Sequence, residues 1–373
     1  MRSSPRKRSN NLTINDVAAL AGVSYQTVSR VLNAMPHVSA TTRERVQTVL
    51  RQVGFRPNMT ARQLATQRST TVGLVTFATS FFGPSQIMVN SEHAAKEMGL
   101  SFMFSSIVEQ SAQEVRRAVD ELCAHQVCGI LIHLPWVVDL RDLREVCRNI
   151  PMVAVDSNFG FKCPSVFIDQ ESGSRKATRH LIDLGHRKIA YLRGPVFWRA
   201  AELRYRGWWK ELKAKGLEPG PVENGDWTAE SGFEATKRLQ KKWGECTAIV
   251  VANDQMALGS IRAFEESGVR VPKNVSVVGF DDIPEAGFYR PPLSTIKQDF
   301  AALGRLSMQC LMAQLQSPPE YPRIRPIQPT LIERKSTGSC SMPQDSLVNT
   351  EVDGAPPVSR GRRRSAQQPS SEE

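Results

Sequence analysis

Residues 13–46 read TINDVAALAGVSYQTVSRVLNAMPHVSATTRERV, and the pattern of apolar and capping residues in them predicts three short helices. Thr13 can cap the first helix, with Asp16 at the third helical position, where an acidic side chain completes a capping box. Gly22 ends that helix without steric cost, because glycine tolerates left-handed backbone. Ser24 then caps the second helix. A short helix, a glycine-containing turn and a second helix predict a helix-turn-helix.

The second of these helices carries the side chains that could read DNA. Its apolar positions face inward and leave Tyr25, Gln26, Ser29 and Arg30 pointing outward, and Asn33 follows at its end. Gln26 can pair two edges of adenine, and Arg30 can form a forked pair with guanine. The alternative is a plain three-helix cap with a polar surface, which these residues alone leave open.

Positive charge is concentrated at the same end of the chain. Residues 1–70 hold eleven Lys and Arg residues against Asp16 and Glu44, so they carry +9 of the net charge of +11. This asymmetry indicates a polyanion bound by one end of the molecule, and double-stranded DNA is the expected partner. The basic arm alone would also fit a solvated or targeting tail.

Several functional classes lack their signatures. The seven cysteines form no CxxC pair, so we expect no metal, and no motif indicates a cofactor. There is no GxSxG, HExxH, GxxxxGK[ST] or GxGxxG motif, which argues against an enzyme. No signal peptide or apolar run of ~18 residues is visible, so we expect a cytoplasmic protein without a membrane partner, associated with the nucleoid through DNA.

From residue 71 onward, β-rich runs alternate with helical ones, which predicts parallel sheets with helices on both faces. Strands are predicted at 72–77, 101–107, 129–134, 188–192 and 247–251, and helices at 86–98, 113–125, 202–213 and 255–267. The length favours an α/β fold of two doubly wound lobes, with a crossover at 156–169. Clefts between such lobes bind ligands at the carboxyl ends of the strands.

The predicted domains are a basic disordered arm at 1–12, the head at 13–57, a hinge helix and linker at 58–70, a two-lobed domain at 71–336 and a disordered tail at 337–373.

Between the head and the lobes, the segment 59–66 can form only about two helical turns. So short a helix is marginal in water because nucleation is costly. We therefore expect it to fold only on DNA, with a plain linker as the alternative.

Polar residues follow several predicted strands. They are Asp156, Asn253, Asp254, Asp281, Asp282 and Gln298, and Trp227 could stack on the apolar face of a sugar. Amides and carboxylates at such positions can bond several vicinal hydroxyls, which favours a polyol over a charged ligand. Each of them could instead be a helix cap or a turn residue.

The head, the RPNMTARQLA segment after it, and GDWTAESGF, VANDQMALGSIRAFEESG, SVVGFDD and PPLSTIKQDFAALG in the second lobe resemble the LacI/GalR family of transcriptional regulators. The resemblance implies a repressor that binds a palindromic operator as a homodimer and is released allosterically by a small sugar. It also implies DNA contacts by Asn58 and Arg62, and by Leu64 as a minor-groove wedge.

The resemblance further implies a set of effector contacts in the two lobes. The polar contacts would be Asp156, Arg204, Asn253, Asp281 and Gln298, with Ile87 and Trp227 as apolar walls. A galactoside is the implied effector.

Two expectations concern assembly and the competing class of function. The family's tetramers form through a leucine heptad helix, and nothing after Thr337 repeats apolar residues at that period, so we expect a dimer.

The alternative function is a periplasmic-type sugar receptor without DNA function. Such a receptor would share the two lobes, would need a signal peptide and would not need the head.

Overall fold

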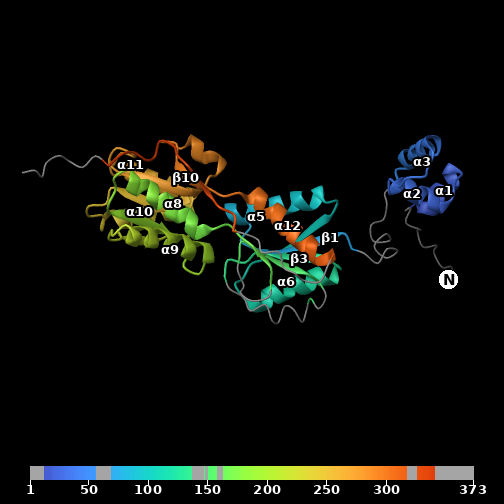
Figure 1. Ribbon diagram of the computed structural model, residues 1–373, viewed down its shortest axis with the longest axis horizontal. Helices are drawn as coiled ribbons and strands as arrows, with labels where there is room; N and C mark the ends of the chain where they lie inside the picture. The colour runs from blue at the N-terminus through green and yellow to red at the C-terminus, as the bar shows by residue number, and fades with distance from the viewer. Residues whose placement is uncertain are drawn as a thin grey trace, which may run out of the picture.

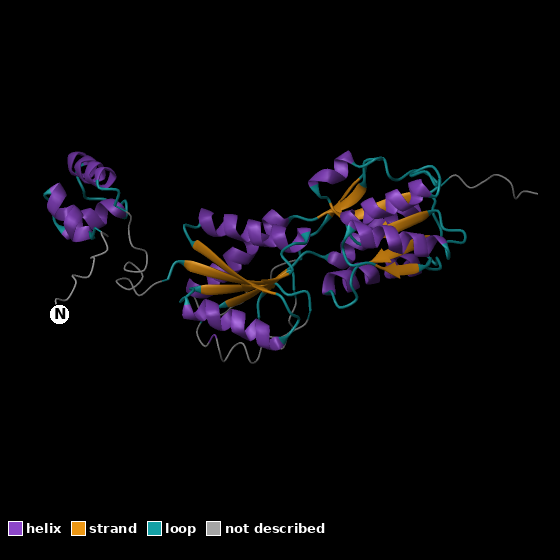
Figure 2. Ribbon diagram, turned by 180° about the vertical axis from the view of Figure 1, so that it is seen from behind, coloured by secondary structure: helices purple, strands orange, loops and turns teal. Residues whose placement is uncertain are grey.

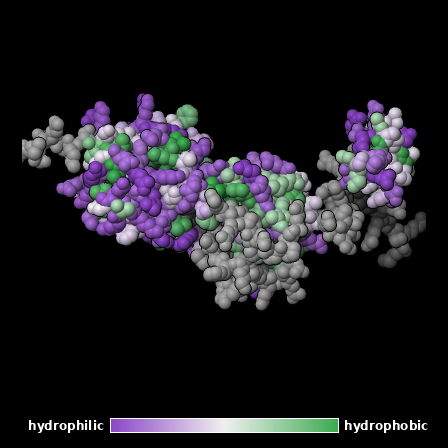
Figure 3. All heavy atoms as spheres, in the orientation of Figure 1, coloured by the Kyte–Doolittle hydropathy of each residue, from purple (hydrophilic) through white to green (hydrophobic). Residues whose placement is uncertain are grey.

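The computed structural model describes residues 12–55, 69–136, 147, 150–157, 163–316 and 326–340. These residues form an all-α head and two α/β lobes, which confirms the predicted fold class (Figures 1 and 2). Among them, no helix is both long and apolar enough to cross a membrane. Hydrophilic side chains cover most of the visible face of the second lobe (Figure 3).

The head consists of α1 (Ile14–Ala21), α2 (Tyr25–Leu32) and α3 (Ala40–Gln52). The predicted capping box is present, since the Asp16 backbone N–H donates to Thr13 Oγ1 and the Asp16 carboxylate accepts from the Thr13 backbone N–H. Gly22 ends α1 with φ +61°. Val17, Val28 and Val46, one from each helix, are fully buried against one another.

The first lobe is built on a five-stranded parallel sheet in the order β2-β1-β3-β4-β5. Its strands are β1 (Thr71–Phe77), β2 (Ser101–Ile107), β3 (Gly129–Ile132), β4 (Met152–Val155) and β5 (Ser165–Val166). Helices α5 (Phe82–Glu97) and α12 (Phe300–Gln316) pack together on one face, and α6 (Ala112–Ala124) covers the other (Figures 1 and 2).

The second lobe has a six-stranded sheet in the order β11-β10-β9-β8-β6-β7, parallel except for β11. Its strands are β6 (Ile189–Arg193), β7 (Val222–Asn224), β8 (Ala248–Val251), β9 (Ser276–Asp281), β10 (Ser294–Lys297) and β11 (Thr330–Ile332). Its helices are α8 (Gln170–Asp183), α9 (Arg199–Ala214), α10 (Ala229–Gln240), α11 (Asp254–Glu266) and the 3-10 turn η1 (Pro284–Phe288). Helix α8 packs on α9, and α10 packs on α11.

The chain passes between the lobes three times, whereas the sequence predicted one passage at 156–169. Ser165–Val166 of that segment form β5, which pairs with β4 and so belongs to the first lobe. The later passages lie between β10 and α12 and between α12 and β11. The first and third run alongside each other, where the Ile327 carbonyl accepts from Asp169 N at 2.9 Å and Ile327 N donates to the Phe167 carbonyl at 3.0 Å.

The predicted start of the tail at residue 337 is wrong by at least four residues. The Cys340 backbone N–H donates to the Leu184 carbonyl at 2.8 Å, and the Gly338 carbonyl lies 3.1 Å from His186 Nε2. These contacts hold residues 337–340 against the second lobe.

Candidate functional site

One cavity of about 390 Å³ lies between the lobes, and all seven predicted effector residues border it. They are Ile87, Asp156, Arg204, Trp227, Asn253, Asp281 and Gln298. The convergence follows from the fold, because the carboxyl ends of parallel strands in the two sheets meet at this cleft. The volume lies within the range of about 300–1,000 Å³ typical of small-molecule sites. That these residues bind an effector stays a prediction.

A larger cavity, of about 650 Å³, lies beside α8. Two of its cations are already neutralised, because Arg175 and Arg179 each donate to the buried carboxylate of Glu211, at 2.9 and 2.7 Å. We therefore place the candidate site in the cleft between the lobes.

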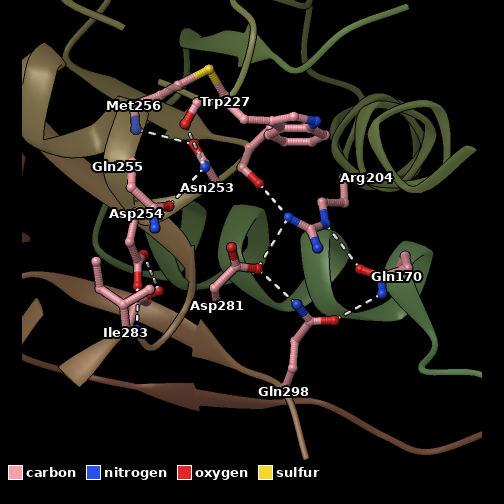
Figure 4. Close-up of polar contacts among 12 residues, drawn as sticks. Gln170, Arg204, Trp227, Asn253, Asp254, Gln255, Met256, Asp281, Ile283 and Gln298 are labelled. Carbon is pink, nitrogen blue, oxygen red and sulfur yellow. Dashed lines mark hydrogen bonds and ion pairs between the residues drawn. The ribbon is translucent and has the colours of Figure 1, made fainter. Parts of the chain in front are cut away.

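Four side chains form a closed ring of polar contacts, and three of them, Arg204, Asp281 and Gln298, border the cavity (Figure 4). Arg204 Nε donates to Gln170 Oε1 at 2.9 Å, and Gln170 Nε2 donates to Gln298 Oε1 at 2.8 Å. Gln298 Nε2 then donates to Asp281 Oδ1 at 2.7 Å. Arg204 Nη1 closes the ring, 3.3 Å from the same oxygen of Asp281. We call these four residues the polar ring.

The two carboxyl groups of the cleft, Asp156 and Asp281, both have raised pKa values. Burial raises the pKa of Asp281 to about 6, although Arg204 and Gln298 act in the opposite direction. Burial also raises the pKa of Asp156 to about 6, against the lowering effect of the Ile168 backbone N–H, which donates to its carboxylate at 3.1 Å. Both groups are therefore mostly ionised at pH 7.5 and mostly neutral at pH 5.

The backbone of three cavity residues has positive φ, at +47° for Asp156, +80° for Trp227 and +116° for Asp281. Such angles cost a non-glycine residue about 1–3 kcal/mol, and they persist where the surrounding structure imposes them. The surrounding structure therefore imposes the backbone conformation at these three residues.

Asn253 joins the cavity to a helix start. Its Oδ1 caps α11 by accepting from Met256 N at 3.0 Å, and its Nδ2 donates to the Trp227 carbonyl at 3.0 Å (Figure 4). Asn253 is therefore a helix cap that also borders the cavity, as Trp227 does, and its contact with an effector stays a prediction.

Sequence reasoning missed Gln170 and His133. Gln170 is 3% exposed and belongs to the polar ring, but as the first residue of α8 it looks like an ordinary helix start. His133 borders the cavity, with Thr76 Oγ1 3.3 Å from its Nδ1, and burial lowers its pKa to about 4, so it is neutral at pH 7. The aromatic residues Phe81 and Trp198 were also missed, although both lie in loops directly before helices.

Other polar residues at the strand ends have structural roles. Asp254 is fully buried and accepts from Thr295 Oγ1 at 2.6 Å and from Ile283 N at 2.9 Å. Asp282 lies 2.7 Å from Arg334 Nη2. The His186 ring lies 2.8 Å from the hydroxyl of Thr247, which is distant in sequence.

The head presents most of the predicted reading residues to solvent. Tyr25 is 48% exposed, and Gln26 and Arg30 are exposed beside it on α2. Ser29 is half-buried, and its carbonyl accepts from the exposed Asn33 side chain at 2.8 Å. DNA contact by these five residues stays a prediction.

The three predicted hinge contacts, Asn58, Arg62 and Leu64, lie outside the described residues. The same holds for the arm up to residue 11 and for the tail from residue 341.

Comparison with known proteins gives two family matches, to bacterial regulatory proteins of the lacI family over residues 13–58 and to a periplasmic binding protein-like domain over residues 178–337. The lactose operon repressor of Escherichia coli K12 is 39% identical over 329 residues, which are 87% of this chain and 91% of that protein. The transcriptional repressor PurR of Haemophilus influenzae PittEE is 34% identical over 336 residues, 88% of this chain and 99% of that one.

Two solved structures have the same architecture. A lac repressor dimer bound to operator and the anti-inducer ONPF has a TM-score of 0.79 at 38% identity and covers 88% of this chain and 100% of its own. The regulator CelR in complex with cellobiose has a TM-score of 0.65 at 31% identity, covering 87% and 99%. The chain therefore belongs to the LacI family of bacterial regulatory proteins, and it is a DNA-binding transcriptional repressor rather than an enzyme.

Proposed function

We propose that the protein binds a palindromic operator as a homodimer and releases it when a small sugar, foremost a galactoside, enters the cleft between the lobes. The observation that carries this proposal is the convergence of Ile87, Asp156, Arg204, Trp227, Asn253, Asp281 and Gln298 on one cavity. These residues come from both lobes and from a passage between them, so a ligand that contacts them all ties the lobes together.

The chemistry of the cavity favours a neutral polyol. Arg204 is already paired with Asp281, so it offers little to an anionic ligand. Carboxylates and amides can bond vicinal hydroxyl groups, and the Trp227 ring can lie against the apolar face of a sugar. Among sugars we prefer a galactoside, because this chain is 39% identical to the lactose operon repressor of Escherichia coli K12.

The head supports sequence-specific DNA binding. Tyr25, Gln26 and Arg30 are exposed on the helix that a helix-turn-helix places in the major groove, and the N-terminal region carries most of the net charge. Two heads on one dimer would then read two half-sites at a fixed spacing. A ligand that shifts one lobe against the other would change that spacing and couple the two sites reciprocally.

Arg30→Ala should relax base preference at one position and cost about 1–3 kcal/mol of operator binding, because a forked arginine contact reads guanine. The operator is first selected from random DNA with the wild-type chain, and half-site variants are then compared by gel shift. Arg45→Ala is the control, since Arg45 is exposed on α3 rather than on α2. Unchanged discrimination between half-sites by Arg30→Ala would contradict the assignment.

Asp281→Ala should leave operator affinity intact and abolish release by methyl β-D-galactoside, because the polar ring loses the group that pairs Arg204. Release is measured by fluorescence anisotropy of labelled operator. Asp183→Asn, an exposed change on α8, is the control and should be released normally. Normal release of the Asp281 variant would refute the cleft assignment.

Binding of methyl β-D-galactoside to the full chain should weaken about tenfold or more between pH 7.5 and pH 5.0. The two cleft carboxyls, with pKa values of about 6, become protonated in this interval and then accept hydrogen bonds less well. Isothermal titration calorimetry at both values tests this. Asp281→Asn, which keeps one of the two carboxyls, should show a smaller change, and equal affinities at the two pH values in the wild-type chain would argue against carboxylate contacts.

The full chain should be a stable dimer in solution, since no leucine heptad follows residue 337. Size-exclusion chromatography with light scattering measures the mass directly. A stable tetramer or a monomer at micromolar concentration would disprove this expectation.

A further inference from the structure

The cavity beside α8, which we call the α8 cavity, has a volume of about 650 Å³ and takes no part in the proposed function. It is bordered by the first passage between the lobes, by α8 and by Leu203 of α9. From α8 it receives Ser172, Arg175, Lys176 and Arg179, whose spacing places them on one face of the helix. The last three of these side chains are cationic, so α8 presents a row of positive charge to the cavity.

Two of these cations are held by one buried carboxylate. Arg175 Nε donates to Glu211 Oε2 at 2.9 Å, and Arg179 Nε donates to Glu211 Oε1 at 2.7 Å. The Glu211 side chain is fully buried on α9, whereas 41% of the Arg175 side chain and 53% of the Arg179 side chain are exposed. Each guanidinium is therefore anchored at Nε while part of it stays open to solvent.

All three cations keep hydrogen-bonding capacity. Among the residues that the structure describes, none accepts a hydrogen bond from the Nη nitrogens of Arg175 or Arg179. Most of the N–H groups of both guanidiniums therefore remain for a ligand. Lys176 Nζ donates to the Pro329 carbonyl at 2.6 Å, which is uncharged and uses only one of its N–H groups.

The carboxylates that border the α8 cavity are engaged by other groups. Asp169 accepts from the Ser172 backbone N–H at 2.9 Å as the cap of α8, and from Gln328 Nε2 at 3.3 Å. Glu171 Oε1 lies 2.7 Å from Lys210 Nζ on α9. Neither carboxylate is paired with a cation of the α8 row.

Positive charge is in excess around the α8 cavity. The charged residues that border it and their ion-pair partners are five cations and three carboxylates, namely Arg175, Lys176, Arg179, Arg206 and Lys210 against Asp169, Glu171 and Glu211. Asp183 at the end of α8 also acts on Arg179, and the cations still outnumber the carboxylates. A concave surface with such an excess favours an anionic ligand.

The donors fit a phosphate group better than a carboxylate. One guanidinium already binds both oxygens of a carboxylate in a forked pair, so a carboxylate would use only part of the row. A terminal phosphate group has three oxygens and a charge of about −2 at pH 7.5, so it can accept from all three cations. Phe167 and Leu203 border the same cavity and offer apolar surface to the rest of a small molecule.

The α8 cavity also touches the connections between the lobes. Asp169 belongs to the first passage, and Ser172 Oγ donates to Gln328 Oε1 of the third passage at 3.0 Å. Gln170 borders the α8 cavity and is a member of the polar ring. A ligand bound here therefore lies against groups whose positions depend on the arrangement of the lobes, which couples its binding to that arrangement.

We propose that the α8 cavity is a second effector site, in which Arg175, Lys176 and Arg179 bind the phosphate group of a small phosphorylated metabolite and so change operator affinity. The site is separate from the cleft between the lobes, and the proposal does not depend on which sugar binds there.

Matched small molecules test the proposal on the full chain by calorimetry at pH 7.5 and constant ionic strength. The probes are glycerol 3-phosphate, inorganic phosphate, glycerol and succinate. We expect both phosphate compounds to bind, glycerol to show no binding, and succinate to bind about tenfold more weakly than glycerol 3-phosphate, because it leaves charged donors unused. Saturating glycerol 3-phosphate should change the affinity for labelled operator about fivefold or more, as measured by fluorescence anisotropy.

Variants locate the binding site. Arg179→Gln should weaken glycerol 3-phosphate binding about tenfold and remove its effect on operator affinity, while Arg175 still pairs with Glu211. Arg262→Gln is the matched control, since Arg262 is 62% exposed on α11, pairs with Glu266 at 2.9 Å and borders neither cavity. It should behave as the wild-type chain does. Thermal melting checks that the variants are folded, and Lys176→Gln replaces Arg179→Gln if the latter is not.

Each result decides one part of the proposal. Absence of phosphate binding to the wild-type chain, or equal binding by the wild-type chain and folded Arg179→Gln, would overturn the site. Equal affinity for succinate and glycerol 3-phosphate would overturn the assignment to phosphate. Binding at this site with unchanged operator affinity would overturn its regulatory role. Sugar binding in the cleft is measured separately, so none of these results bears on the proposed function.

Discussion

The cleft depends on the burial of one cation, the guanidinium of Arg204, which is 6% exposed. A buried charge without partners would destabilise the fold by several kcal/mol. Its partners come from separate parts of the chain, with Gln170 at the start of α8, the Ala252 carbonyl after β8, and Asp281 at the end of β9. The Phe280 ring lies 3.8 Å below it and adds a cation–π contact. The guanidinium of Arg204 therefore has all these partners only when the three segments of the second lobe are packed together at the edge of the cavity.

The same constraint connects the two lobes. Gln298 lies on the passage between β10 and α12, and it bonds both Asp281 and Gln170. Gln170 also donates to Asp156 at the end of β4 in the first lobe, at 3.2 Å. A relative shift of the lobes would therefore change hydrogen bonds that hold the buried charge. A ligand that exchanges these hydrogen bonds can therefore favour one relative position of the lobes over another. Such a shift would also move the start of the first lobe, to which the head is joined.

The sequence predicted features that depend on local rules. Thr13 and Gly22 bound α1 where capping rules place them, and Asp156, Asn253, Asp281 and Gln298 meet because strand ends converge in doubly wound sheets. Arg204 and Ile87 came only from family resemblance, since nothing local marks a helical arginine or an apolar residue as part of a site. Gln170, His133 and Trp198 depend on packing between segments far apart in sequence, which no single-sequence pattern records. Two of the three passages between the lobes were missed for the same reason, because α12 follows β10 directly yet packs on α5 in the other lobe.

A ligand entering the cleft meets polar groups that already bond one another. Each new hydrogen bond to Asp281 or Gln298 replaces an internal one, so the net gain per bond is on the order of 1 kcal/mol rather than the value for an unpaired group. Affinity must then come mainly from apolar contact, which the aromatic residues bordering the cavity, such as Trp198 and Trp227, can supply, while the exchanged polar bonds decide which ligand fits. Because the exchanged bonds also join the lobes, selectivity and conformational coupling use the same side chains. A coupling of about 1–3 kcal/mol, typical of allosteric proteins, is within reach of exchanging only two or three such bonds.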